Sequence, residues 1–166
     1  MNTERRQFLS FAGMTALGTL LLASCGSGDA AEAADHYPVQ MSDAAWRRKL
    51  GPDAFAVLRQ GATEQPYSSP LNDEHGTGIF ACKGCDNPLY SSKTKFDSHT
   101  GWPSFWAPLP HAILTRSDHS LLMERTEVHC ARCGGHLGHV FDDGPPPTGK
   151  RYCMNGVAMV FHPGKA

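Results

Sequence analysis

Beyond its first few residues the chain has no cluster of lysine and arginine, and its formal net charge is -1. Proteins that bind nucleic acid through the phosphate backbone need concentrated positive charge, so nucleic acid is disfavoured as the main partner. At 166 residues the chain is also too short for two domains of ordinary size. One domain with additional segments is expected.

Apolar residues are scarce as well, at 40% of the chain, whereas glycine (17) and proline (12) are frequent. This composition disfavours long helices and predicts many turns between short elements. The sequence has no internal repeat beyond two C-x-x-C pairs. A mainly β or loop-rich fold is therefore favoured.

Residues 1–24 are predicted to be a signal peptide rather than part of a domain. Arg5 and Arg6 precede an uncharged run from Phe8 to Ser24 that is rich in Gly, Ala and Thr and only mildly apolar. This pattern is typical of twin-arginine signals, so export to the periplasm or cell envelope is expected. The alternative is an N-terminal transmembrane anchor.

The uncharged run ends in Leu22-Ala23-Ser24-Cys25, which resembles a bacterial lipoprotein box. Cys25 is therefore expected to carry lipid and to anchor the protein to a membrane. The alternative is cleavage nearby without lipidation. Residues 25–40 begin with small and polar residues and are predicted to form a flexible, lipid-linked tether. The folded domain is expected over residues 41–166.

Two short helices are predicted at the start of the domain. The first begins after a suitable N-cap residue, Ser42, and ends at Gly51; the second begins at Pro52 and ends at Gly61. Their apolar residues recur three or four positions apart, as on one face of a helix. Both helices are expected to cover one end of the core.

From Gly78 onward the pattern changes to short β-like runs separated by turn residues. The predicted strands are Gly78–Cys82, Leu89–Ser91, Trp102–Trp106, Ala112–Thr115, Leu121–Cys130, Leu137–Phe141 and Tyr152–Phe161. No two of them are separated by a convincing crossover helix, so antiparallel sheets are expected. Residues Ser117–Ser120 are predicted to form the loop of one hairpin.

The two C-x-x-C pairs, Cys82–Cys85 and Cys130–Cys133, have the spacing of metal-binding knuckles. Four thiolates at about 2.3 Å suit tetrahedral zinc, and a closed site is structural because no position is left for water or substrate. The 44 residues between the pairs predict a clamp that joins distant strands. Disulfide bonds are an alternative, because the signal directs the chain to an oxidising compartment, and catalytic zinc is another. Twin-arginine export carries folded proteins, which would let zinc bind first.

Cys153 stands apart from these pairs. If its segment is extended, Arg151, Cys153 and Asn155 share one face of the strand. A neighbouring positive charge favours the reactive thiolate, and an amide can orient either substrate or thiolate. Cys153 is therefore a candidate nucleophile, and the alternative is a buried structural thiol.

His136 and His139 follow the second cysteine pair in a glycine-rich stretch. Histidine is the usual residue for moving a proton near neutral pH, so one could act in acid–base chemistry and the other in orientation. The alternatives are hydrogen-bonded core or surface histidines, or additional metal ligands. In the turn that follows, Asp143 could hold a histidine or cap the loop.

A dense aromatic cluster occupies residues Gly101–Trp106. Such clusters are more often core than pocket. Glycine and proline on either side of Trp102, however, should fix the orientation of its ring, and an aromatic face suits a sulfur atom or a methyl group.

Several of these fragments, taken together and in order, resemble the methionine-R-sulfoxide reductase B family from about Ser42 to Phe161. They are the two C-x-x-C pairs, Gly-Trp-Pro-Ser-Phe, His-Leu-Gly-His-Val-Phe-x-Asp-Gly-Pro and Pro-Thr-Gly-x-Arg-Tyr-Cys-x-Asn. The resemblance implies a mainly β fold of two small antiparallel sheets, with structural Zn2+ on the four paired cysteines. It also implies thiol-dependent reduction of the R epimer of methionine sulfoxide in proteins, an activity that repairs oxidised proteins.

The same resemblance assigns roles to individual residues. Cys153 would attack the sulfoxide sulfur while His139, with His136 nearby, helps to protonate the oxygen. Methionine would leave, and a sulfenic acid would remain on Cys153. The residues assigned to positioning are Trp102, for the methyl group of the substrate, and Arg151 and Asn155, for the thiolate.

The chain departs from the family at two positions. Many members carry a resolving cysteine immediately before Gly-Trp-Pro, where this chain has Thr100. Six cysteines, with one assigned to lipid, four to zinc and one as nucleophile, leave none for an intramolecular disulfide. An external thiol, on a thioredoxin-like protein, is therefore expected to reduce the sulfenic acid. The second departure is Gly156, where a serine is common, and it is expected to soften the strand beyond the active site.

Two other functions compete with the enzyme. A non-catalytic, zinc-clamped β module that binds a partner would need the paired cysteines but not Cys153, His139 or Trp102, so the presence of all three favours the enzyme. A thiol–disulfide oxidoreductase is disfavoured because the C-x-x-C pairs do not lie in a βαβ pattern.

Overall fold

The computed structural model describes residues 36–120 and 123–166. The predicted signal peptide, Cys25, residues 25–35 of the predicted tether and the first two residues of the strand predicted from Leu121 lie outside these ranges. Within them, Tyr37 already contacts the folded unit, because its ring meets His129 edge-on with 5.9 Å between centroids. Two residues later, the backbone N–H of Val39 donates to the carbonyl of Arg132 at 2.8 Å.

The helix α1 (Asp43–Gln60) contains both predicted helices. Ser42 caps its start by accepting a hydrogen bond from a backbone N–H of the first turn. Gly51 interrupts it with φ 73°, a left-handed value that favours glycine, and Pro52 follows as the first residue of the second half. Gly61 ends the helix in the left-handed conformation. The two helices are thus confirmed as the halves of one kinked element.

None of the helices in the described ranges combines the length and the apolar character that a membrane span requires.

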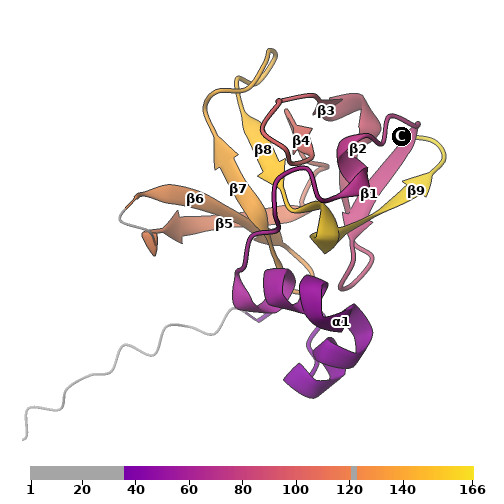
Figure 1. The fold of residues 1–166 in the computed structure, drawn as a ribbon, viewed down its shortest axis with the longest axis vertical. Helices are drawn as coiled ribbons and strands as arrows, with labels where there is room; N and C mark the ends of the chain where they lie inside the picture. Colours follow the sequence, from indigo (N-terminus) through magenta and orange to yellow (C-terminus); the bar gives the residue numbers. More distant parts are fainter. Residues whose placement is uncertain (1–35, 121–122) are drawn as a thin grey trace, which may run out of the picture. The chain divides into compact units, whose positions relative to one another are not determined.

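The strands form two antiparallel sheets, as predicted (Figure 1). The three-stranded sheet has the order β2 (Pro88–Ser91), β1 (Gly78–Cys82), β9 (Met159–Pro163). The six-stranded sheet has the order β3 (Lys95–Phe96), β4 (Ser104–Phe105), β8 (Arg151–Met154), β7 (His136–Phe141), β6 (Arg125–Cys130), β5 (Ile113–Asp118). Short 3-10 helices lie at η1 (Pro70–Asn72), η2 (Ser92–Thr94) and η4 (Gly156–Ala158).

The single strand predicted over Tyr152–Phe161 is wrong, because β8 and β9 belong to different sheets. The chain turns between them in η4, where the Glu64 carboxylate accepts hydrogen bonds from the N–H groups of Gly156 and Val157. A Cβ on Gly156 would lie 2.0 Å from the hydroxyl oxygen of Ser69. The strand β8 therefore ends at Met154, and Gly156 begins a 3-10 turn instead of softening a continued strand. The predicted hairpin loop is also shifted, because β5 extends through Asp118.

The core lies between the sheets and under α1, which packs against β7 and η4. Tyr90 and Phe105 stack with ring centroids 4.3 Å apart, and Phe80 meets Phe105 at 5.0 Å. The Tyr90 hydroxyl donates to the Met154 sulfur at 3.1 Å. Through Met154 this packing fixes the position of β8, the strand that carries Cys153.

Candidate functional site

A pocket of about 140 Å³ opens on the six-stranded sheet. Its lining residues are Thr63, Trp102, Arg125, Gly138, His139, Phe141, Cys153 and Asn155. The structure thus brings together Cys153, His139 and Trp102, which the sequence predicted to share a site. Cys153 lies on β8 directly between two neighbours, opposite His139 of β7 and Ser104 of β4. Because it holds residues that the resemblance assigns to catalysis, we call this space the catalytic pocket.

Hydroxyl groups surround the sulfur of Cys153. The Thr100 Oγ1 atom lies 3.8 Å from Cys153 Sγ, and the Ser98 hydroxyl bridges Thr100 and Ser104 at 2.8 and 2.7 Å. Burial raises the pKa of the Cys153 thiol, while the Thr100 hydroxyl and the nearby Arg151 guanidinium oppose that rise. The sequence suggested that the neighbouring cation would favour the thiolate of Cys153. In the structure, the effect of burial on the pKa outweighs the effect of that cation. Cys153 is half-buried, and its surroundings favour the thiol over the thiolate.

His139 lies opposite Cys153, and a carboxylate fixes its ring. Its Nε2 lies 2.7 Å from Asp118 Oδ2, and the same oxygen accepts a hydrogen bond from Arg125 at 2.7 Å. Hydrogen bonds from Ser120 and from His139 lower the pKa of Asp118, so this carboxylate is ionised and only accepts. Nε2 of His139 must then carry a proton, which leaves Nδ1 as the acceptor of the neutral ring. Burial lowers the pKa of His139 and favours that neutral ring.

His136 forms a second arrangement of the same kind, beside the first. Its Nδ1 lies 2.7 Å from Glu127 Oε1, and Arg116 pairs with the other oxygen of that carboxylate. Burial opposes ionisation of Glu127, but the hydrogen bonds from His136 and Arg116 outweigh it and lower its pKa to about 2. The rings of His136 and His139 lie 5.4 Å apart at 65°. His136 therefore supports the wall behind His139 and is 6% exposed.

Asp143 holds Arg151, which is neither the histidine nor the loop cap that the sequence suggested for this aspartate. Its two carboxylate oxygens accept from Nε and Nη2 of Arg151, both at 2.8 Å. This bidentate pair places the guanidinium 4.5 Å over the ring of Phe141, a lining residue of the catalytic pocket. The cation is thus fixed at the edge of the pocket, on the strand that carries Cys153.

Asn155 and Trp102 are both tied to the segment around Glu64. The side-chain amide of Asn155 donates to the carbonyl of Leu137 at 3.0 Å and accepts from the N–H of Glu64 at 2.9 Å. The indole N–H of Trp102 donates to the carbonyl of Glu64 at 3.2 Å. The polar atoms of Asn155 are therefore used to hold the pocket wall, and Trp102 presents a ring of fixed orientation.

The two C-x-x-C pairs meet at a second site. The sulfurs of Cys82 and Cys133 lie 3.7 Å apart, those of Cys85 and Cys130 lie 3.5 Å apart, and all four lie within 4.8 Å of one another. A disulfide would require about 2.05 Å, so these contacts are not disulfides. The edge of a tetrahedron with Zn–S bonds of 2.3 Å is about 3.8 Å long, close to both distances. The donor set therefore fits a tetrahedral metal ion.

The knuckles are built alike. In each, the carbonyl of the first cysteine accepts from the N–H four residues later, at 2.8 Å from Asp86 to Cys82 and at 2.8 Å from Gly134 to Cys130. Both donors have left-handed φ values, 58° at Asp86 and 67° at Gly134. Because Cys82 ends a strand of one sheet and Cys130 a strand of the other, a metal ion here joins the two sheets. The predicted clamp between distant strands is confirmed in its geometry.

Several residues of the site were missed from the sequence. They are Asp118 and Glu127, which hold the histidines; Arg116 and Arg125, which hold those carboxylates; Glu64, behind Trp102 and Asn155; and Ser98 and Ser104, beside Thr100. Alternation along β6 places Arg125 and Glu127 on one face, which is the only sequence signal that could have found any of them.

The chain is similar to known proteins over the whole of this region. A family model described as the SelR domain matches residues 50–163. Peptide methionine sulfoxide reductase MsrB of Agrobacterium fabrum is 51% identical over 126 residues, which cover 75% of this chain and 93% of that protein. Proteins of the same name from Thioalkalivibrio sulfidiphilus and Pseudomonas fluorescens are each 52% identical, over 125 and 119 residues, and are covered to 91%. Those alignments cover 75% and 71% of this chain.

Proposed function

This chain belongs to the SelR-domain family and is a peptide methionine-R-sulfoxide reductase of the MsrB type, and from that premise we propose that Cys153 is its nucleophile. The observation that carries the proposal is the catalytic pocket itself. One small space holds a thiol, a histidine fixed by a carboxylate and the face of an indole. A sulfoxide has a sulfur to be attacked, an oxygen to be protonated and a methyl group to be held.

His139 moves the proton in the first step. Cys153 is a thiol because burial raises its pKa, and His139 is neutral because burial lowers its pKa. Nδ1 of His139 takes the proton as the Cys153 sulfur attacks the sulfoxide sulfur, and then gives it to the departing oxygen. The attack forms an S–S bond between Cys153 and the substrate. The protonated oxygen then passes to the Cys153 sulfur as the S–O bond and this S–S bond break, so methionine leaves and Cys153 remains as a sulfenic acid. Asp118 stabilises the imidazolium that forms between the two transfers.

An external thiol closes the cycle. One thiolate attacks the Cys153 sulfenic acid and releases water, and a second thiol then displaces it as a disulfide and restores Cys153. The remaining cysteines of the described ranges are the four of the metal site, and the Thr100 hydroxyl lies 3.8 Å from the Cys153 sulfur. We propose that a thioredoxin-like protein is the reductant.

The ion of the four-cysteine site is proposed to be Zn2+ with a structural role. Four thiolates in tetrahedral arrangement are a donor set that zinc prefers, and they leave no open position for water or substrate. When bound, the ion would neutralise buried thiolates and fasten the two sheets. Asn87 supports the donor set, because its amide lies 3.6 Å from the Cys130 sulfur.

The cellular placement is proposed on the sequence alone. Twin arginines and the box that ends at Cys25 support export to the periplasm or cell envelope, with lipid on Cys25 as the anchor. Mass spectrometry of the membrane-bound protein should find a lipid on an N-terminal Cys25. Cys25→Ala should release the protein from membranes, and a membrane-bound Cys25→Ala protein would reject the anchor.

The decisive test of the activity uses the two sulfoxide epimers of a blocked methionine with dithiothreitol as reductant. Wild-type protein should reduce the R epimer and not the S epimer, and Cys153→Ser should reduce neither. Zinc content and thermal unfolding of Cys153→Ser should match those of wild type, which shows that the variant is folded. Reduction of the S epimer, or activity in the variant, would contradict the proposal.

A further inference from the structure

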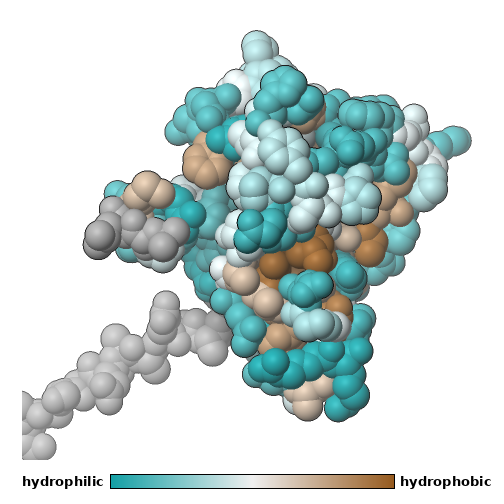
Figure 2. All heavy atoms as spheres, in the orientation of Figure 1, coloured by the Kyte–Doolittle hydropathy of each residue, from teal (hydrophilic) through white to brown (hydrophobic). Residues whose placement is uncertain are grey.

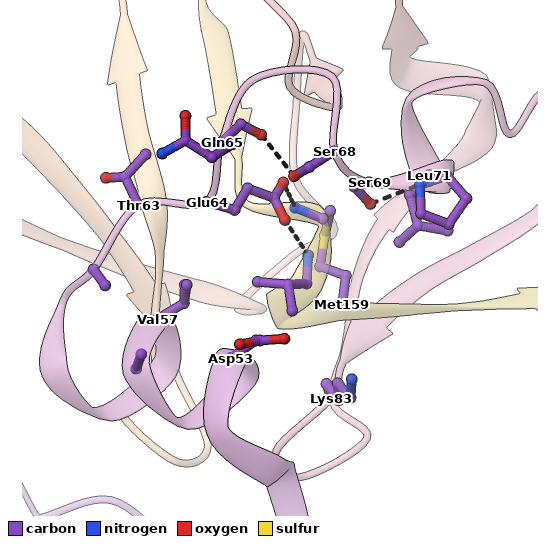
Figure 3. A pocket seen from close by; sticks show the side chains of 15 residues that line it. Asp53, Val57, Thr63, Glu64, Gln65, Ser68, Ser69, Leu71, Lys83 and Met159 are labelled. Atoms are coloured by element: carbon purple, nitrogen blue, oxygen red, sulfur yellow. Dashed lines mark hydrogen bonds between the residues drawn. The ribbon is translucent and has the colours of Figure 1, made fainter.

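A second and larger pocket lies beside the catalytic pocket and has no part in the chemistry described above. Its volume is about 660 Å³, within the range of about 300–1,000 Å³ that is usual for ligand pockets. It is lined by the second half of α1, by residues 62–65 and 68–71, by Lys83, and by η4 with the start of β9. Figure 2 shows apolar surface between α1 and the beginning of β9, and Figure 3 shows the pocket from close by. We call it the α1–η4 pocket.

The interior of this pocket is apolar and its floor is fixed. Ala56, Val57, Leu71, Val157 and Met159 contribute apolar side chains. At the centre of Figure 3 the Glu64 carboxylate accepts from the N–H groups of residues 156 and 157 at 2.5 and 2.8 Å. The half-buried Glu64 carboxylate is already hydrogen-bonded to the backbone, and the other charged lining residues, Asp53 and Lys83, are exposed, so the pocket is suited to an apolar group.

One segment of chain separates the two pockets. Thr63 lines both of them, and the consecutive residues Asn155 and Gly156 line one each. Between the pockets, the backbone of Glu64 bonds to Asn155 and Trp102 on the catalytic side, while its carboxylate bonds to η4 on the other. A polypeptide that crosses residues 62–65 can therefore reach both pockets.

The size of the catalytic pocket makes such a crossing necessary. Its volume of about 140 Å³ is well below the range of about 300–1,000 Å³ that is usual for ligand pockets, so it has room for one side chain and little more. The substrate is a polypeptide, so residues next to the oxidised methionine must lie on the surface around this opening. We propose that the α1–η4 pocket is a subsite that binds an apolar side chain of the substrate, one that flanks the methionine sulfoxide. This inference rests on the proposed function.

The subsite predicts a preference that small substrates cannot show. The test compares five-residue peptides that have methionine-R-sulfoxide at the centre and either leucine or glycine at one of the four flanking positions. A blocked single methionine-R-sulfoxide serves as the small substrate without flanking residues. Dithiothreitol serves as reductant, so no protein reductant is present. Leucine at one of the four positions should lower KM about tenfold relative to glycine, as expected for burial of one apolar side chain.

Filling the pocket should abolish this preference. Ala56→Trp places a large side chain in the pocket from α1, whereas Ala44→Trp makes the same change on the exposed part of the same helix. Ala56→Trp should raise KM for the leucine peptide about tenfold, to the value of the glycine peptide, and leave turnover of the blocked methionine sulfoxide within about twofold. Ala44→Trp should retain the leucine preference. If Ala56→Trp proves unstable, Ala62→Trp at the exposed rim of the pocket decides in its place.

Three results would overturn the subsite. They are equal KM values for the leucine and glycine peptides in wild type, equal losses on peptide and blocked substrate in the pocket variants, and an effect seen only when thioredoxin replaces dithiothreitol. The last would assign the pocket to the reductant. Failure of wild type on the blocked R sulfoxide would instead reject the proposed function, so the two failures are distinguishable.

Discussion

The hydroxyl of Thr100 lies 3.8 Å from the sulfur of Cys153, although 53 positions separate the two residues. This is the position before Gly-Trp-Pro where many members of the family carry a resolving cysteine. The fold therefore keeps the geometry for an intramolecular disulfide while the chain has a hydroxyl in its place. Thr100 also belongs to a chain of hydroxyls with Ser98 and Ser104. That chain can donate to the sulfur when it is charged, and accept from it when it is a thiol.

Thr100→Cys should convert the enzyme to one that resolves its own sulfenic acid. The new sulfur would start close to Cys153, and a small rotation brings the pair to the disulfide distance of about 2.05 Å. After one turnover with the R sulfoxide and no reductant, the variant should lose two free thiols within one chain. Wild type and Thr100→Ser should instead hold a sulfenic acid that dimedone traps. A Thr100→Cys protein that still reacts with dimedone would show that the two side chains do not meet.

Thr100→Val should slow the reactions of Cys153. The Thr100 hydroxyl opposes the rise that burial causes in the pKa of Cys153, so its removal should raise that pKa further. Hydrogen bonds to charged groups contribute about 1.5–3 kcal/mol, which corresponds to about a tenfold or greater fall in thiolate at a given pH. The pH dependence of alkylation by iodoacetamide measures this directly. Thr100→Ser keeps the donor and should alkylate like wild type, and equal rates for serine and valine would contradict the role.

Local motifs predicted the parts of the site that are held by short stretches of chain. The cysteine knuckles, the strand with Cys153 and the turn before Trp102 each depend on residues a few positions apart, so their spacing was sufficient. The contacts of the Asp118 and Glu127 carboxylates with the two histidines could not be predicted in this way. Asp118 precedes His139 by 21 positions, and only the register of β5, β6 and β7 brings them together.

The same limit explains the wrong strand prediction and the ionisation of Cys153. Residues 152–161 have a continuous β-like pattern, but a carboxylate 92 positions before Gly156 turns the chain there. Arg151 next to Cys153 suggested a thiolate, yet burial by distant strands outweighs that charge. In both cases a contact across the fold decides against a local preference.

His139→Gln should remove the acid limb from the pH profile of the chemical step. Only neutral His139 can take the Cys153 proton, so wild-type activity should fall as pH drops through the lowered pKa of His139, below its ordinary 6.5. His139→Gln should be slower by about 10²–10⁴-fold, the usual contribution of a general base, and show no such limb. Single turnovers of reduced enzyme, without added reductant, avoid the pH dependence of the reductant.

Asp118→Asn tests how His139 is held and should cost about tenfold or more, typical for a residue that orients a functional histidine. It should also move the acid limb, because the aspartate hydrogen bond opposes the lowering of the His139 pKa by burial. Without the carboxylate the pKa should fall further, and the limb should shift to lower pH. A fall in rate with an unchanged limb would mean that Asp118 acts only through stability.

Glu127 should make the protein sensitive to acid. Folding lowers the pKa of Glu127 from 4.5 to about 2, which means that the folded state favours the ionised form. This contribution is fully present above pH 4.5 and is lost as pH falls toward 2, and its size is about 3 kcal/mol. Glu127→Gln should therefore lower the free energy of unfolding by about that amount at pH 7, and the difference should shrink near pH 3. Urea unfolding at both pH values measures it, and a difference independent of pH would contradict it.

Removal of the metal should unfold the domain rather than only inactivate it. The four sulfurs come from knuckles that follow strands of two different sheets, so a bound metal ion links the two sheets. Apparent binding free energies of about 10–16 kcal/mol for structural zinc match or exceed the whole stability of a typical domain, about 5–15 kcal/mol. Cys133→Ser should therefore bind no zinc and lack a cooperative thermal transition. Cys153→Ser, which changes a cysteine outside the cluster, should hold one zinc per chain and unfold like wild type. Purified wild type without metal, and with four fewer free thiols, would show instead that the pairs form disulfides.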